Sequence, residues 1–206
     1  HDVTSLDTAA ACAHPLGALG LRVVSRVRVL TINIWNRSGP WQHRRALLEK
    51  GIAELSADVI GLQEVLWREG GEASQAHDLT DAIGALTGQP HHLAFGPAFT
   101  YESGEAFGNA VISRHPLRDA ELVRFGGSDA RSVLGCRVEL AEGLLPFFVT
   151  HLSWRMEEGL LRERQVRELS DFVSAYCVPG DLPAVVVGDL NAQPDAQEIR
   201  FLRGLT

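Results

Sequence analysis

In the first part of the chain, the spacing of apolar residues is first that of a strand, then that of a helix, and then that of a strand again. Residues 27–33 alternate and are rich in β-branched side chains, which predicts a strand. Residues 41–55 carry apolar side chains at helical spacing, and residues 58–64 form a short apolar run typical of a buried strand. These segments predict a βαβ unit with a right-handed crossover. Residues 72–87 predict a second helix.

The middle of the chain shows no helical period. Turns that contain Gly and Pro separate short apolar segments, and we expect these segments to pair as antiparallel strands. The expected strands cover residues 91–95, 107–113, 119–125 and 131–140, and residues 144–151 form a further apolar strand after them. A long amphipathic pattern then predicts a helix over residues 157–176, and an apolar run over 183–191 predicts a further strand. The chain therefore contains a second expected βαβ unit.

Length and composition favour one soluble globular domain. The chain has 206 residues, 45% of them hydrophobic, and a net charge of −7, values that exclude a largely disordered protein. We expect a partly irregular leader over residues 1–26 and the domain over residues 27–206. No window is long and apolar enough for a transmembrane helix. The acidic balance argues against a nucleic-acid coat protein, but an enzyme that binds phosphate through a cation stays compatible with it.

The cysteines and the N-terminal segment bear on the compartment. Cys12, Cys136 and Cys177 are widely spaced and form no Cys-x-x-Cys pair, so we expect free thiols in a reducing compartment. The first 25 residues lack the pattern of a signal peptide, which predicts a cytoplasmic protein. A secreted protein is the alternative if an export signal was removed. No pattern indicates an obligate protein partner.

Polar residues end four of the apolar strands. Asn33 and Glu64 end the two strands of the first βαβ unit, and His151, Asp189 and Asn191 end those of the second. The carboxyl edge of an open α/β sheet is where ligands bind. Positions i and i+2 of an extended strand share a face, which would place Asp189 beside Asn191. Carboxylate and amide oxygens suit Mg²⁺ or Mn²⁺ and suit zinc poorly, and His151 would add a titratable group.

Each of these residues also has a simpler interpretation. A single Asn or Glu at a strand end is most often a turn or cap residue, and His151 alone is more often a histidine of the core. Their occurrence together at equivalent strand ends favours a metal-dependent site. Other chemistries lack their motifs, because the chain has no Gly-x-Ser-x-Gly elbow, no P-loop and no His-Glu-x-x-His.

Five segments, taken in order, resemble the endonuclease/exonuclease/phosphatase superfamily, which includes deoxyribonuclease I. They are Leu-Thr-Ile-Asn33, Gly-Leu-Gln-Glu64, Gly108-Asn109-Ala-Val-Ile-Ser-Arg114-His-Pro116, Thr150-His151-Leu-Ser-Trp and Gly188-Asp189-Leu-Asn191-Ala-x-Pro194. The resemblance implies an α/β (α+β) fold, a four-layer sandwich of two mixed β-sheets packed face to face with helices outside. It also implies Mg²⁺-dependent hydrolysis of a phosphoester by water, with Mn²⁺ as a substitute. The substrate would be a nucleic acid, a phospholipid or a small phosphate.

The resemblance also implies roles for the residues that match its motifs. Glu64 would be the main metal ligand, with Asn33 beside it. Asp189 would orient or deprotonate the attacking water. Asn191 would contact a phosphate oxygen, and His151 would stabilise charge on the phosphoryl oxygens.

The family motif also contains Asn109 and Arg114. It suggests contact with the substrate for Asn109 and a structural role for Arg114. Trp35 occupies the place where AP endonucleases carry an acidic residue, which argues against the abasic-site branch. Trp35 and Trp154 adjoin the expected site and could stack on a base, contact a lipid or simply pack.

One motif of the family has no counterpart in the chain. Members end in Ser-Asp-His, whose Asp and His complete the site, and this chain has no His after His151. We therefore expect the closing C-terminal strands to be missing from the sequence. The alternative function is a non-catalytic binding module on the same fold.

Overall fold

The structure, a computed structural model, describes residues 26–68, 74–127 and 130–205, so Cys12 and residues 1–25 of the expected leader lie outside the described residues. The strands are β1 (Val29–Asn33), β2 (Val59–Trp67), β3 (His92–Thr100), β4 (Ala106–Ser113), β5 (Leu117–Phe125), β6 (Arg131–Leu140), β7 (Gly143–His151) and β8 (Val185–Asp189). The helices are α1 (Trp41–Leu55), α2 (Gln75–Thr87), α3 (Gly159–Tyr176) and α4 (Gln197–Leu202). None of the described helices has both the length and the apolar character needed to span a membrane.

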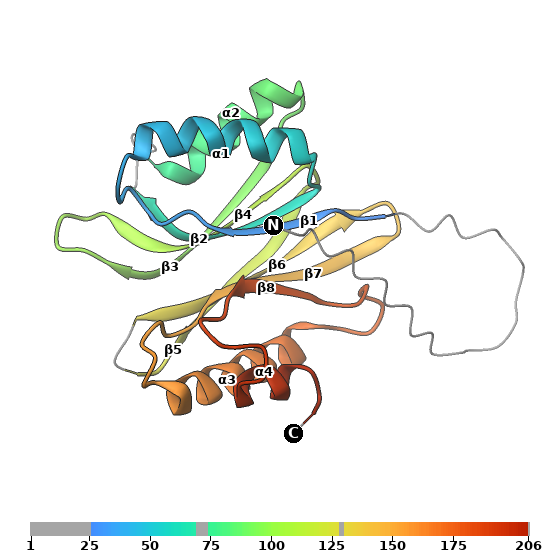
Figure 1. The fold of residues 1–206 in the computed structure, drawn as a ribbon. Helices are drawn as coiled ribbons and strands as arrows, with labels where there is room; N and C mark the ends of the chain where they lie inside the picture. Colours follow the sequence, from blue (N-terminus) through green and yellow to red (C-terminus); the bar gives the residue numbers. More distant parts are fainter. Residues whose placement is uncertain (1–25, 69–73, 128–129, 206) are drawn as a thin grey trace, which may run out of the picture.

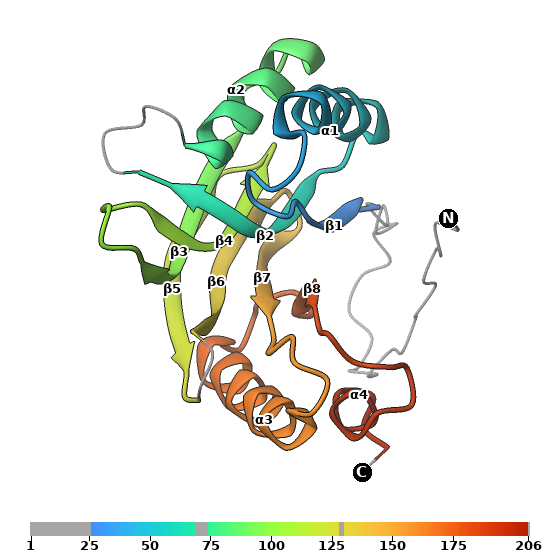
Figure 2. The ribbon, with the colours of Figure 1, turned by 60° about the vertical axis from the view of Figure 1, so that its left-hand side comes forward.

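The strands form two mixed sheets that lie face to face between two layers of helices (Figure 1). The first sheet has the order β1-β2-β4-β3 and the second the order β5-β6-β7-β8. Helices α1 and α2 cover the outer face of the first sheet, and α3 and α4 lie outside the second (Figure 2). β1 pairs with β2 and β7 with β8 in parallel, whereas the other pairs are antiparallel. The expected four-layer sandwich is confirmed.

Several strands are buried on both faces, which explains their continuous apolar runs. In β2, Leu62 packs in the cluster under α1 and α2, while Val59 packs between the sheets. In β7, Phe147 and Val149 pack between the sheets, while Phe148 packs against α3. Successive strand residues point to opposite faces, so a strand covered on both sides needs apolar residues at every position.

Two strands extend beyond their expected ends. β3 runs to Thr100 although Gly96 and Pro97 interrupt its pattern, because pairing with β4 resumes at Phe99 after a shift in register. β2 continues to Trp67, past its expected end at Glu64, because its pairing with β4 also resumes after a shift in register. Backbone pairing with a neighbour therefore decides these ends, and not the local composition.

Cys136 and Cys177 are free thiols. Cys136 lies in the core between the sheets, where burial raises the pKa of its thiol to about 12. Cys177 is only half buried, and burial raises the pKa of its thiol as well. Because the thiolate is the reactive form of cysteine, neither residue is suited to nucleophilic chemistry.

Candidate catalytic site

The polar strand ends meet at one edge of the sandwich. Asn33 pairs with Gln63 at the end of β1, and His151 pairs with Asp189 at the end of β7. Because parallel neighbours end at the same edge, each sheet presents its polar residues together. A cavity of about 360 Å³ lies there, lined by the polar residues Asn36, Glu64, Arg131, His151, Asp189 and Asn191 and by the aromatic residues Trp35, Phe107 and Trp154.

The Asn33 side chain connects the two carboxylates of the site. Its amide nitrogen donates to Glu64 Oε1 at 2.9 Å and to Asp189 Oδ2 at 3.0 Å. Its amide oxygen accepts the backbone N–H of Trp35 at 2.8 Å. The Asn36 amide nitrogen donates to the other oxygen of Glu64, Oε2, at 3.0 Å. Neighbouring amides therefore orient both carboxylates.

His151 lies between Arg131 and Asp189. Arg131 Nη1 is 3.1 Å from His151 Nδ1, and a guanidinium can only donate, so Nδ1 accepts and the proton of the neutral ring sits on Nε2. His151 Nε2 faces Asp189 Oδ2 at 3.8 Å. His151 is 4% exposed and Arg131 is 8% exposed. The cavity wall thus combines an imidazole N–H with a buried guanidinium, which suits an anionic ligand.

A turn that Asp189 itself stabilises follows the end of β8. Asp189 Oδ1 accepts the backbone N–H of Asn191 at 3.1 Å, and the Asp189 carbonyl accepts the N–H of Leu152 at 3.0 Å. The Asn191 amide nitrogen donates to the Leu152 carbonyl at 3.0 Å. Asn191 has a φ of 48°, so this turn, and not an extended strand, brings both side chains to the cavity.

Unusual backbone conformations concentrate at the cavity. Six non-glycine residues of the described ranges have positive φ, and four of them line it. The four are Trp35 (53°), Asn36 (40°), Glu64 (58°) and Asn191 (48°). Glu64 lies where the register of β2 against β4 shifts, and such bulges re-aim side chains. Left-handed conformations at bulky residues are costly and cluster at functional sites, so this cavity is the strongest candidate for one.

A buried ion pair joins α3 to α4, the helices that follow the β7 and β8 ends of the site. Arg162 Nε and Glu198 Oε1 are 2.7 Å apart, and the side chains are 8% and 4% exposed. Arg162 also donates to the carbonyls of Ser153 at 3.3 Å and Arg155 at 2.7 Å. Because Glu198 belongs to α4, the pair connects the segment after His151 with the segment after Asp189.

Asn109, for which the family motif suggests contact with the substrate, is 2% exposed and is not among the residues that line the cavity. Its amide nitrogen donates at 3.0 Å to the Ser132 carbonyl, which also accepts Thr150 Oγ1 at 3.1 Å. Asn109 is in β4 and Ser132 in β6, so the bond connects the two sheets beside Arg131. In this position Asn109 is bonded to the strand that supplies Arg131 to the cavity wall.

Asn36 and Arg131 line the cavity but do not belong to the strand-end pattern. Asn36 lies three residues after the end of β1, and a second asparagine so close to Asn33 is the signal that would have found it. Arg131 begins an antiparallel strand, and its neighbour Ser132 pairs with His151. The start of an antiparallel strand adjoins the end of its partner, so knowledge of the β6–β7 pairing was needed to predict Arg131.

The donor set fits a hard divalent cation. Glu64 and Asp189 offer two carboxylates, and Asn33 turns its amide nitrogen towards both of them. Within the described ranges, no three or more His, Cys, Asp or Glu side chains group as metal ligands, so water would have to complete the coordination of any cation held here. Mg²⁺ is commonly bound through one or two carboxylates and keeps several waters. The two carboxylates could therefore hold a hard divalent cation together with bound water.

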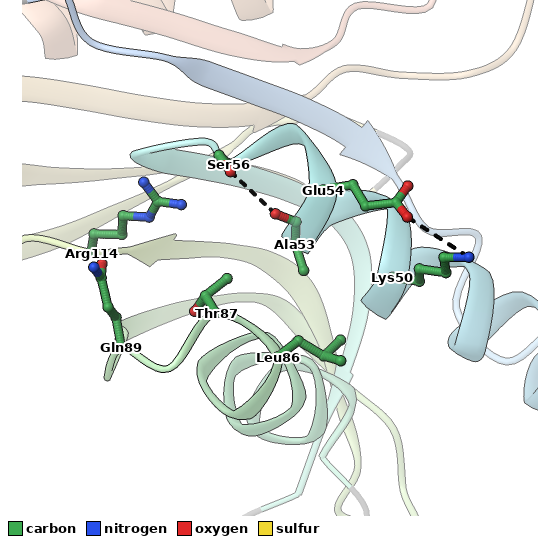
Figure 3. A pocket seen from close by; sticks show the side chains of 8 residues that line it. All are labelled: Lys50, Ala53, Glu54, Ser56, Leu86, Thr87, Gln89 and Arg114. Atoms are coloured by element: carbon green, nitrogen blue, oxygen red, sulfur yellow. Dashed lines mark hydrogen bonds and ion pairs between the residues drawn. The ribbon is translucent and has the colours of Figure 1, made fainter.

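A hollow of about 520 Å³ lies between the C-terminal ends of α1 and α2 (Figure 3). Lys50 and Glu54 on its wall pair with each other at 3.7 Å. Arg114 on another wall pairs with Asp58 at 3.5 Å, which ties the end of β4 to the start of β2. Because the charged side chains around the hollow are held in ion pairs and do not converge on it, we do not assign catalysis to this hollow.

Comparison with known proteins agrees with the fold. A sequence model described as the Endonuclease/Exonuclease/phosphatase family matches residues 30–206. An endonuclease/exonuclease/phosphatase family protein from Leptotrichia buccalis is similar in structure, with 18% identity, a TM-score of 0.68, and coverage of 87% of this chain and 74% of that chain. The human nocturnin catalytic domain with bound sulfate has 20% identity, a TM-score of 0.68, and coverage of 84% and 67%.

An endonuclease/exonuclease/phosphatase from Beutenbergia cavernae is also similar, with 26% identity and a TM-score of 0.66. The alignment covers 86% of this chain and 53% of that chain, so the chain spans about half the length of this relative. Among curated proteins, none matches the sequence significantly.

Proposed function

This chain belongs to the endonuclease/exonuclease/phosphatase family, and from that premise we propose that it is a metal-dependent hydrolase of phosphodiesters. Members of the family hydrolyse phosphoesters and generally use divalent metal ions. The observation that carries the proposal is the convergence of Glu64 and Asp189 on the Asn33 amide, beside His151 and Arg131. This arrangement joins carboxylates for a cation and a water to donors for a phosphate.

Phosphodiesters resist attack because both the nucleophile and the target are rich in negative charge. When bound, Mg²⁺ would neutralise part of that charge and acidify water. Glu64 would be its main ligand, because the amides of Asn33 and Asn36 hold both of its oxygens in a fixed orientation. Asn33 would need to turn its amide oxygen inward to serve as a second ligand, since Trp35 now holds that oxygen.

The remaining residues would act on water and on the phosphoryl group. Asp189 Oδ2 faces the cavity beside Asn33 and would accept a proton from the attacking water. His151 Nε2–H and the Arg131 guanidinium would donate to phosphoryl oxygens as charge grows on them. An amide nitrogen carries two hydrogens, so Asn191 can donate one to Leu152 and the other to a phosphate oxygen.

The direct test is hydrolysis of bis(4-nitrophenyl) phosphate and 4-nitrophenyl phosphate by the full chain. We expect turnover with Mg²⁺ or Mn²⁺, a faster rate on the diester, and a fall to the background rate with EDTA that added Mg²⁺ reverses. Glu64→Gln is the matched variant, because it keeps the size of the side chain and removes the charge. Equal rates for wild type and Glu64→Gln would contradict the proposal. Absence of hydrolysis with every metal would favour the binding module instead.

A second prediction concerns Asn36, which orients Glu64 without contacting the cation. Asn36→Gly removes the amide but tolerates the φ of 40° at this position, so the backbone strain falls while the support of Glu64 is lost. Losing such a support typically weakens metal affinity about 10–100-fold, and we expect the Mg²⁺ concentration for half-maximal rate to rise accordingly. Ser56→Gly is the control, since Ser56 has a φ of 52° far from the site. Equal Mg²⁺ titrations for the two variants would refute the role.

A further inference from the structure

Two exposed tryptophans border the candidate catalytic cavity. Trp35, on the β1–α1 loop, is 54% exposed, and Trp154, on the β7–α3 loop, is 59% exposed. Both line the cavity that holds Glu64 and Asp189, and they reach it from opposite sheets. Large aromatic side chains are usually buried, so two open rings at one polar cavity point to contact with a ligand.

The ring of Trp35 is held in place by the site itself. Trp35 has a φ of 53°, a costly conformation for a bulky residue. Its backbone N–H donates to Asn33 Oδ1 at 2.8 Å, so the side chain that bridges the two carboxylates also orients this loop. Gly39 lies against the ring, where an added Cβ would be 3.2 Å from Trp35 Cζ3. A ring held in this way loses little conformational entropy when a ligand stacks on it.

A fixed cation lies against this ring. The guanidinium carbon of Arg44 is 5.4 Å from the centroid of Trp35 and 5.3 Å from that of Trp41. Arg44 cannot move away easily, because it donates to the carbonyls of Ile34 at 2.6 Å and Ser38 at 2.5 Å. Trp35 is therefore a supported platform and not a mobile surface side chain.

The cations beside these rings bear on what the rings can bind. Arg155 lies 5.9 Å from the centroid of Trp154, so each tryptophan of the cavity already has an Arg on its ring. Aromatic cages attract quaternary ammonium groups through the negative face of the ring. The Arg44 guanidinium opposes a second cation at the Trp35 ring by charge repulsion, whereas it does not oppose a neutral planar ring. At Trp154 the charge of Arg155 is partly offset by Glu158, 3.6 Å away. Trp35 thus suits a nucleobase better than a choline headgroup.

We propose that Trp35 is a stacking subsite for a nucleobase that adjoins the scissile phosphate, with Trp154 as a second wall. The substrate class of the site is then a nucleotide phosphodiester. This inference rests on the proposed phosphodiesterase function. The net charge of −7 favours a short nucleotide ester over a long polyanion.

The experiment compares three diesters that share one leaving group. They are the 4-nitrophenyl esters of thymidine 5′-phosphate, of phosphorylcholine and of methyl phosphate, assayed with Mg²⁺. We expect wild type to prefer the thymidine ester over the other two in kcat/KM by about tenfold or more. Trp35→Ala should lower that preference about tenfold, whereas Trp35→Phe should keep most of it. Tyr101→Ala, which removes an aromatic side chain that is 46% exposed but not part of the cavity lining, should leave the preference unchanged.

A binding titration separates failure of the subsite from failure of the enzyme. Thymidine 5′-monophosphate should quench the tryptophan fluorescence of wild type more strongly than phosphocholine does, and Trp35→Ala should weaken its binding about tenfold. Hydrolysis with an unchanged preference in Trp35→Ala, or a preference for the choline ester, would overturn the subsite alone. Absence of hydrolysis would overturn the proposed function, and the titration would then decide the subsite by itself.

Discussion

Replacement of Asp189 by Asn is expected to lower kcat on a phosphodiester about 10²–10⁴-fold, the usual contribution of a general base. The substitution keeps the size of the side chain and an oxygen that can accept the N–H of Asn191. The Asp189 carbonyl would still accept the Leu152 N–H, so the turn should persist. What disappears is the negative charge at Oδ2, which faces Asn33 and His151.

The matched control for this variant is Asp195→Asn, which makes the same chemical change at an exposed position in the same β8–α4 segment. Its kcat should equal that of wild type. Circular dichroism and thermal unfolding should show that both variants fold. If Asp189→Asn retained a kcat within threefold of wild type, Asp189 would not act on the water.

Replacement of Gly188 by Ala is expected to cause a large loss of stability. Gly188 lies opposite Thr150 in the parallel β7–β8 pair, and an added Cβ would be 2.2 Å from the Thr150 carbonyl oxygen. Backbone cannot rotate away as a flexible side chain can, so the two strands must separate. Overpacking of this kind costs about 1–3 kcal/mol, and occasionally more. Activity should fall too, because the next pair in the register is His151 with Asp189.

Gly51→Ala is the control, since an added Cβ in the middle of α1 would meet nothing within 4 Å. Ala in a helix interior is about 0.5–1 kcal/mol more stable than Gly, so this variant should match or exceed wild type. Urea unfolding with equal m-values measures both differences. A Gly188→Ala protein as stable as wild type would show that β7 and β8 are less closely paired than described.

The elements that sequence reasoning predicted best are those whose burial follows a simple period. The helix expected over residues 41–55 has those bounds in the structure, because one of its faces packs on the first sheet and the other is exposed. The family motifs in addition predicted the two mixed sheets, which strand periods alone could not assign to one sheet or the other. The bulge at Glu64 was not predicted, since the shift in register depends on how β2 pairs with β4.

Part of the candidate site could also be predicted, because it follows from a pattern along the strands. A polar residue that ends an apolar run is visible in the sequence, and the four such residues or pairs converge in the structure, although Glu64 lies at a bulge within β2 and not at its end. Arg131 was not visible in this way, because it begins an antiparallel strand. Asn36 lies in a loop, where polar residues are ordinary, and only its closeness to Asn33 in the sequence pointed to it.

The sequence by itself determined the order of strands and helices and the polar strand ends, because the periods of 2 and 3.6 are local properties of the chain. Only the tertiary structure decided that Asn33 reaches Asp189, 156 positions further along, and that Arg131 lies against His151. It also decided that Trp35 stands open at the cavity with Arg44 against its ring. These contacts depend on strand register and on the packing of one sheet upon the other, which no local pattern encodes.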